Sequence, residues 1–128
     1  MDKLERVAQE LHEGWREYKS ERRWVYGPTR TSNTHPHLIA WHQLDNESQN
    51  QDRFIAAILL REFADGNLTS EILPAAIHDG WTLWERIHGR SHPHALPYAE
   101  VHAEDPGEHA VQAARVAAVL GLAEGGQS

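Results

Sequence analysis

Cysteine is absent from this chain of 128 residues. No disulfide can therefore cross-link the fold, and no thiolate can act as a nucleophile or a metal ligand. Disulfides are rare in the cytoplasm, and we expect a cytoplasmic protein. Apolar runs approaching the roughly 20 residues of a membrane-spanning helix are also missing, so we expect no contact with a membrane. The N-terminus is charged and helix-patterned, unlike a signal peptide.

An excess of basic residues is lacking too, since 12 Lys and Arg face 19 Asp and Glu, for a formal net charge of -7. A nucleic-acid polymer requires a broad basic surface, so we do not expect one as a partner. The sequence contains no phosphate-binding glycine loop, no glycine-flanked nucleophile and no helix-turn-helix signal. We therefore assign no catalytic residue and do not expect an enzyme.

Helical patterns are present, and 40% apolar residues suit one domain with one core. Apolar spacing predicts helices over about 3–22 and 47–65, a third opening at Thr69 or Ser70 and ending at Gly89, and a fourth with Pro106 near its start. Residues 35–44 are expected to be extended. The core side of the fourth helix is predicted to carry Val111, Ala114, Ala118, Val119 and Leu122.

An internal repeat organises these helices. The segment from Leu11 to Trp15 (LHEGW) reappears from Ile77 to Trp81 (IHDGW), and the His-Pro-His at 35–37 reappears at 92–94. Trp41 and Tyr98 also correspond. We expect a mainly α, single domain over 1–128 with two pseudo-symmetric helix–extended–helix halves, at about 3–66 and 69–122, and a flexible tail at 123–128. Each half would expose its apolar stripe without the other.

The segment Trp24-Val25-Tyr26 alternates like a short strand and is stopped by Gly27-Pro28, which predicts a β-hairpin found only in the first half. Five cations lie near it in the sequence: Arg16, Lys19, Arg22, Arg23 and Arg30. Aromatic faces beside positive charge suit a nucleobase with phosphates. Alternatively, the two aromatic side chains fill the groove between the halves, and the cations form a solvated helix face.

These residues resemble the RyR domain, the repeat of ryanodine receptors. The likeness is carried by His12-Glu13-Gly14-Trp15, Lys19, Trp24-Val25-Tyr26-Gly27-Pro28-Thr29-Arg30 and His35-Pro36. It covers residues 4–66, and residues 71–122 look like a degenerate second copy without the hairpin. Arg23 stands where the family pattern has glycine.

The resemblance implies binding of an adenine-containing nucleotide, including cyclic and ADP-ribose-type signalling nucleotides, in a groove between the halves. In the calcium channels, adenine nucleotide stacks between tryptophans of paired repeats. In prokaryotes and phages, the family implies nucleotide sensing or sequestration beside defence modules, with signal output through a partner or a homo-oligomer. The expected ligand-binding residues are Trp24, Tyr26, Lys19, Arg30, Trp15, Arg23, Trp41 and Trp81, although Trp15 and Trp81 are expected to be mainly core residues.

Two other functions stay open. The domain could be a structural protein-interaction module without a ligand. His78-Asp79 also resembles the metal-binding pair of certain phosphohydrolases, but those need further His and Asp ligands on other helices, and the repeat explains the pair as a copy of His12-Glu13. We therefore predict neither a metal nor a cofactor.

Overall fold

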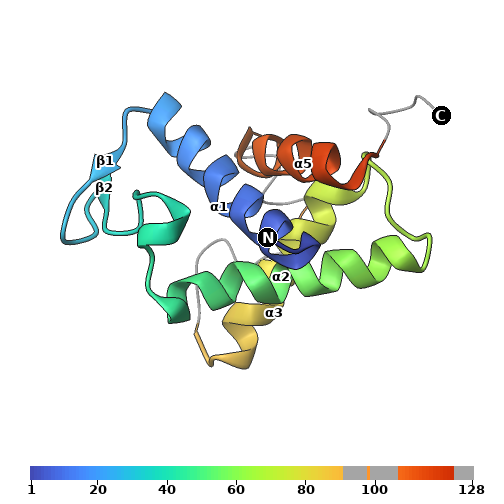
Figure 1. Cartoon of the computed structure of the whole chain (residues 1–128). Helices are drawn as coiled ribbons and strands as arrows, with labels where there is room; N and C mark the ends of the chain where they lie inside the picture. The colour runs from blue at the N-terminus through green and yellow to red at the C-terminus, as the bar shows by residue number, and fades with distance from the viewer. Residues whose placement is uncertain (91–97, 99–106, 123–128) are drawn as a thin grey trace.

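The computed structural model describes residues 1–90, 98 and 107–122, and its fold is mainly helical, as predicted (Figure 1). Four long helices surround one core, and two very short strands project at one end of the molecule. The elements are α1 (Lys3–Glu21), β1 (Val25–Tyr26), β2 (Thr34–His35), the 3-10 turn η1 (Trp41–Gln43), α2 (Asn46–Ala64), α3 (Leu73–Ile87) and α5 (Gly107–Leu120). The predicted tail at 123–128 and the second His-Pro-His lie outside the described residues.

Side-chain caps fix where the first two long helices begin. The Asp2 carboxylate accepts a hydrogen bond from the Glu5 amide at 2.8 Å, and Asp45, predicted as a cap, accepts one from the Ser48 amide at 2.7 Å. Each carboxylate satisfies an amide that has no partner within its helix and lies at the positive end of the helix dipole. The third helix begins later than predicted, at Leu73, because Thr69 instead closes a preceding turn.

The short β element confirms the predicted strand at Trp24–Tyr26, but its two strands run parallel rather than antiparallel as in a hairpin. Val25 pairs with Thr34 and Tyr26 with His35. The connecting loop must therefore double back, and Thr31 holds it: its hydroxyl lies 2.6 Å from that of Thr34, and its amide donates to the Thr34 carbonyl. This loop carries Arg30.

Residues 35–44 are not a continuous extended segment. The ring Nδ1 of His35 accepts the His37 amide at 3.0 Å and forms a turn, and the side chain of Gln43 accepts the Ala40 amide at 3.0 Å and starts η1. Alternating apolar residues predicted a strand here, but these local side-chain bonds provide the backbone with another partner.

One core joins the predicted halves. Helix α1 packs against both α2 and α5, and α3 packs against the same two helices. The fully buried side chains include Val7 and Leu11 from α1, Leu59 from α2, and Leu73, Ile77 and Val116 from α3 and α5. The division into two halves stays a prediction, but neither predicted half contains a separate core.

Ring geometry repeats between the two predicted halves. The ring centroids of His12 and Trp15 are 5.8 Å apart, and those of their counterparts His78 and Trp81 are 5.7 Å apart. His12 lies 6.1 Å from Trp41, and His78 lies 5.9 Å from Tyr98, the residue that the repeat aligns with Trp41. The sequence repeat is thus accompanied by matched aromatic triads.

The predicted core stripe of the last helix is only partly right, since Val119 and Leu122 pack against the core. Ala114 and Ala118 are exposed, whereas Gln112, Ala113, Val116 and Leu120 are buried. Several alanines around this helix allow more than one apolar stripe. The buried face is selected by contact with α1, where the polar side chain of Gln112 finds an acceptor, the carbonyl of Leu11, at 2.9 Å.

Gly14 and Gly80 occupy equivalent repeat positions and provide a matched test of this packing. A Cβ on Gly14 would lie 2.8 Å from the Cα of Gln112, a backbone contact, whereas one on Gly80 would lie 3.2 Å from a methyl group of Ile55. We expect Gly14→Ala to lower the free energy of unfolding by about 1–3 kcal/mol. Both variants gain about 1 kcal/mol because alanine favours a helix over glycine. Gly80→Ala should cost less because the side chain of Ile55 can shift, whereas the backbone of Gln112 cannot. Urea unfolding would measure both, and equal losses would contradict a backbone-limited contact at Gly14.

Candidate functional site

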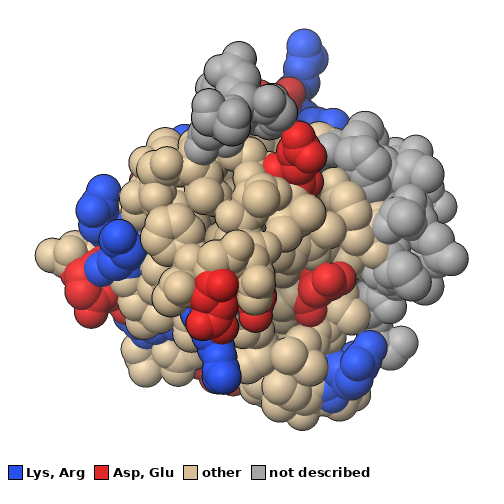
Figure 2. Space-filling view, turned by 90° about the vertical axis from the view of Figure 1, so that its right-hand side faces the viewer, with Lys and Arg blue, Asp and Glu red and all other residues tan. Residues whose placement is uncertain are grey.

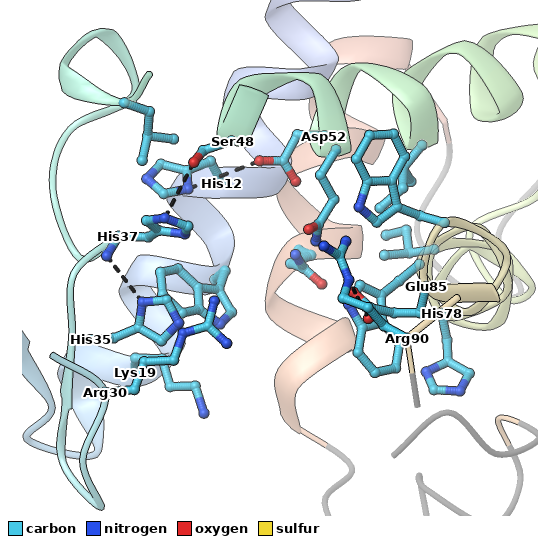
Figure 3. Close-up of a pocket in the computed structure, with 18 of the residues that line it drawn as sticks. His12, Lys19, Arg30, His35, His37, Ser48, Asp52, His78, Glu85 and Arg90 are labelled. Atoms are coloured by element: carbon cyan, nitrogen blue, oxygen red, sulfur yellow. Dashed lines mark hydrogen bonds and ion pairs between the residues drawn. The ribbon is translucent and has the colours of Figure 1, made fainter. Parts of the chain in front are cut away.

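A cavity of about 900 Å³ opens between the β end of the molecule and α3. This volume lies within the range of about 300–1,000 Å³ that small-molecule sites occupy. Figure 3 shows two facing walls: Lys19, Arg30, His35 and His37 on one side, and His78, Glu85 and Arg90 on the other. Asp52 and Ser48 of α2 lie between the walls at one end of the cavity (Figure 3).

The cavity brings together five of the eight residues predicted to bind ligand. Trp24, Lys19, Arg30, Trp15 and Trp81 all line it. Trp15 and Trp81, expected to be mainly core residues, are only partly buried, and Trp81 also packs against the edge of the core. The tryptophans of the two repeat segments therefore face one shared space.

The other three predicted residues lie elsewhere. Tyr26 is 56% exposed on β1 and does not line the cavity. Arg23 is exposed and has a positive φ of 65°, which turns the chain between α1 and β1. Trp41 is buried within the core cluster.

Positive charge is concentrated at the wall next to the β element. Neither Lys19 nor Arg30 forms an ion pair with a described carboxylate, unlike Arg53, which pairs with Glu5. Burial, together with the positive charges of Arg30, His37 and Lys19, lowers the pKa of His35 to about 4. His35 is therefore neutral at pH 7, and an entering anion would favour its protonation.

The ammonium group of Lys19 already lies over the face of the Trp24 ring. The Lys19 ammonium lies 4.4 Å from the centre of the Trp24 ring, which is a cation–π geometry. Trp15 makes an edge contact with His35, with centroids 4.9 Å apart and an interplanar angle of 78°. One wall thus presents two indoles, an ammonium, a guanidinium and an imidazole to the same space.

Asp52 places a carboxyl group at the cavity between the two walls. Its side chain is 15% exposed, and burial raises its pKa to about 8. Its nearest described partner is the Nδ1 of His12, 4.0 Å away. The Nε2 of His12 lies 2.8 Å from the Ile39 carbonyl, so it carries the proton and leaves Nδ1 without one in the neutral ring. Burial also lowers the pKa of His12.

A chain of hydrogen bonds runs from α3 to α1 across the opposite side. Gln112 donates to the Leu11 carbonyl, so its oxygen accepts from His109 Nδ1 at 3.0 Å. His109 Nε2 then accepts from His78 Nδ1 at 3.1 Å, and His78 Nε2 is left to accept from Thr82 at 3.4 Å. This chain of bonds fixes α5 against the two tryptophan-bearing helices.

The α3 wall contributes an indole donor without an acceptor. The Nε1 of Trp84 is buried and has no hydrogen-bond partner in the part of the chain that the structure describes. An unpaired buried donor costs free energy, which an oxygen of a bound molecule would recover. Arg90 also lines this wall and pairs with Glu85 at 3.0 Å.

Sequence reasoning missed Asp52, Glu85, His109 and Gln112 as cavity residues, and assigned Trp84 only to the apolar stripe of the third helix. A signal for Asp52 was present: it lies three and seven residues before Ile55 and Leu59, on the buried stripe of α2. A lone carboxylate on an apolar stripe indicates a site. His109 and Gln112 were hidden because the wrong face of the last helix was chosen.

The metal alternative finds no support among residues 1–90, 98 and 107–122, where no group of three His, Asp or Glu side chains is arranged to hold an ion. His78 is buried and bonded to His109, while the adjacent Asp79 is exposed, so this pair does not converge on one point. Within the same ranges, no helix has the length and apolar composition needed to cross a bilayer.

Comparison with known families agrees with this geometry. A family model of the RyR domain matches residues 1–72, more than half of the chain, and the protein belongs to the RyR domain family. No curated protein matches the sequence. The matched segment contains α1, the β element and α2, and therefore the cationic wall; Trp81, Trp84 and Arg90 of the opposite wall lie beyond it.

The low pKa of His35 provides a test of the cationic wall. Arg30→Gln and Lys19→Gln should each raise this pKa, by roughly 0.5, because a unit charge a few ångströms away in a solvated site contributes about 1 kcal/mol. NMR titration of the imidazole would measure the change. Arg61→Gln, in the last turn of α2, is the matched control and should leave it unchanged.

The same group makes stability depend on pH. Because the pKa of His35 is lower in the folded state, the contribution of the neutral ring to the free energy of unfolding is complete above about pH 6.5. That contribution is lost as the pH falls towards 4.

A His35 pKa that stays the same in both the Arg30→Gln and Lys19→Gln variants would show that the two cations do not act on this wall.

Proposed function

We propose that this domain binds an adenine-containing nucleotide in the cavity and does not act on it chemically. The observation that carries the proposal is the convergence of Trp15 and Trp24 with Lys19 and Arg30 on one wall of a cavity that Trp81 of α3 also lines. Indole faces stack on a base, and the two cations bind its phosphates.

The charge distribution supports a small anion over a polymer. The protein is acidic overall, with a net charge of -7. On the face in Figure 2, the Lys and Arg side chains lie singly, several of them beside Asp or Glu, without merging into one basic patch. A polyanion requires such a patch along its length, whereas a nucleotide needs only the local cations of one cavity wall.

Unsatisfied groups in the cavity support binding further. Trp84 presents a donor without an acceptor, and Lys19 and Arg30 lack described carboxylate partners. Each gains an interaction when phosphate or ribose oxygens enter. We include signalling nucleotides of the cyclic and ADP-ribose types in this class, and roles as a sensor or as a sequestering protein, in a phage-defence setting and with or without self-association.

Recovery of the ligand separates binding from catalysis. The protein would be incubated with ATP, ADP-ribose, NAD and cyclic nucleotides, denatured, and the released compound identified by mass. A binding protein returns the nucleotide intact. The nucleotide also stabilises the folded state, by about 2.7 kcal/mol at a concentration of a hundred times Kd, so the protein melts at a higher temperature. A converted nucleotide would contradict the proposal, and so would unchanged melting with every nucleotide.

Trp24→Ala should weaken nucleotide binding roughly ten- to a hundredfold, because loss of base stacking on an aromatic ring costs about 1–3 kcal/mol. Tyr26→Ala is the matched control, since Tyr26 lies two residues further along the chain, in β1, and outside the cavity. Calorimetric titration would give both affinities. A Trp24→Ala protein that melts far below wild type, yet binds normally when folded, would identify Trp24 as a packing residue instead.

Arg30→Gln should also weaken binding, and the difference from wild type should shrink as salt is raised from about 0.05 to 0.5 M, because an exposed charge contact is screened. Arg23→Gln removes an equal charge from an exposed position outside the cavity and should have little effect. The two variants together distinguish a local phosphate contact from a general effect of net charge. Equal losses in both would refute the local contact.

A further inference from the structure

We propose that Asp52 recognises the base of the bound nucleotide, its carboxyl group forming paired hydrogen bonds with the amino group and the adjacent ring nitrogen of adenine. This inference rests on the proposed function. It assigns base selectivity to α2, the element between the two cavity walls, and links that selectivity to pH.

The position of Asp52 leaves its hydrogen-bonding capacity unused. Figure 3 shows one carboxyl oxygen directed towards His12 and the other towards the cavity. The distance to His12 Nδ1 is 4.0 Å, beyond hydrogen-bond length, and no other described group forms a hydrogen bond or ion pair with the carboxyl. A nearly buried carboxyl without a partner is costly, and a ligand with complementary groups would relieve that cost.

The surroundings of Asp52 hold it in the protonated form at pH 7. Burial is the cause of its raised pKa of about 8. Titratable groups from every neighbouring element share the cavity with it. From α1 and the β element with its flanks these are His12, Lys19, Arg30, His35 and His37. From α2, α3 with the residues after it, and α5 they are Glu47, His78, Glu85, His88, Arg90 and His109. None of these forms an ion pair with Asp52 apart from the long approach of His12.

A neutral carboxyl presents a hydroxyl donor beside a carbonyl acceptor. Adenine presents the complementary pair along one edge, the N1 acceptor and the N6 amino donor. An ionised carboxylate instead presents two acceptors, which match the N1–H and N2 amino donors of guanine and repel the N1 lone pair of adenine. The protonation state of Asp52 therefore determines which purine is favoured.

The dimensions suit a base held against the indole wall. The ring of Trp15 lies 5.8 Å from that of His12, and His12 lies 4.0 Å from the Asp52 carboxyl. A purine that contacts the indoles of this wall can therefore direct an edge to α2 while its phosphates extend towards Lys19 and Arg30. Base, sugar and phosphates then each meet a different part of the cavity.

The experiment measures the affinities of ATP and GTP for the full chain from pH 7 to 9. The triphosphate ionises in the same way in both nucleotides, so its effect cancels when the two profiles are compared. The wild-type affinity for ATP should fall about tenfold between pH 7 and 9, following the neutral fraction of a group with a pKa of about 8. The affinity for GTP should stay level or rise. Parallel falls for the two nucleotides would overturn the inference without any variant.

Asp52→Asn provides the second readout, because its amide keeps a donor beside an acceptor at every pH. This variant should retain ATP binding and lose the pH dependence. Asp65→Asn makes the same chemical change at the exposed end of α2 and should keep the wild-type profile. An Asp52→Asn protein with the wild-type profile overturns the role of Asp52, whereas the proposed function survives if Trp24→Ala still weakens binding. Failure of both nucleotides to bind at any pH overturns both.

Discussion

The close approach of α1 to α5 is the constraint on which the rest of this structure depends. Gly14 permits it, because any side chain there would meet the backbone of Gln112. At this short distance the Gln112 amide reaches the Leu11 carbonyl, and its oxygen orders His109 and then His78. A single contact between helices from opposite ends of the chain therefore fixes the tautomers and the positions of the rings behind the cavity.

The side of the cavity towards the helical core favours uncharged groups. Burial lowers the pKa of His12 and raises that of Asp52 there. Lys19 and Arg30 lie towards solvent at the β end. A molecule with a neutral, flat part and an anionic part matches this gradient, and its orientation in the cavity follows from it.

Much of the fold could be predicted from the sequence, since helical stripes such as Val7 to Leu11 and caps such as Asp45 are local signals. The parallel pairing of β1 with β2 could not, because the bonds of Thr31 that turn the loop back depend on the folded loop itself. The face of α5 was mispredicted because alanine is compatible with both a buried and an exposed position. The indole and cationic residues of the site were accessible through the Trp24–Arg30 motif. Asp52 had a local signal as a carboxylate on the buried stripe of α2, but its place in the cavity depends on its enclosure by α1 and α3.

The distribution of tryptophan has a practical consequence. Four of the five indoles, Trp15, Trp24, Trp81 and Trp84, line the cavity, and Trp41 alone lies in the core. Excitation of this protein in the near ultraviolet therefore samples mainly the walls of one space, and the emission of Trp24 is subject to the charge of the neighbouring Lys19 ammonium. The chain contains its own optical reporter, which registers events inside the cavity without an attached dye.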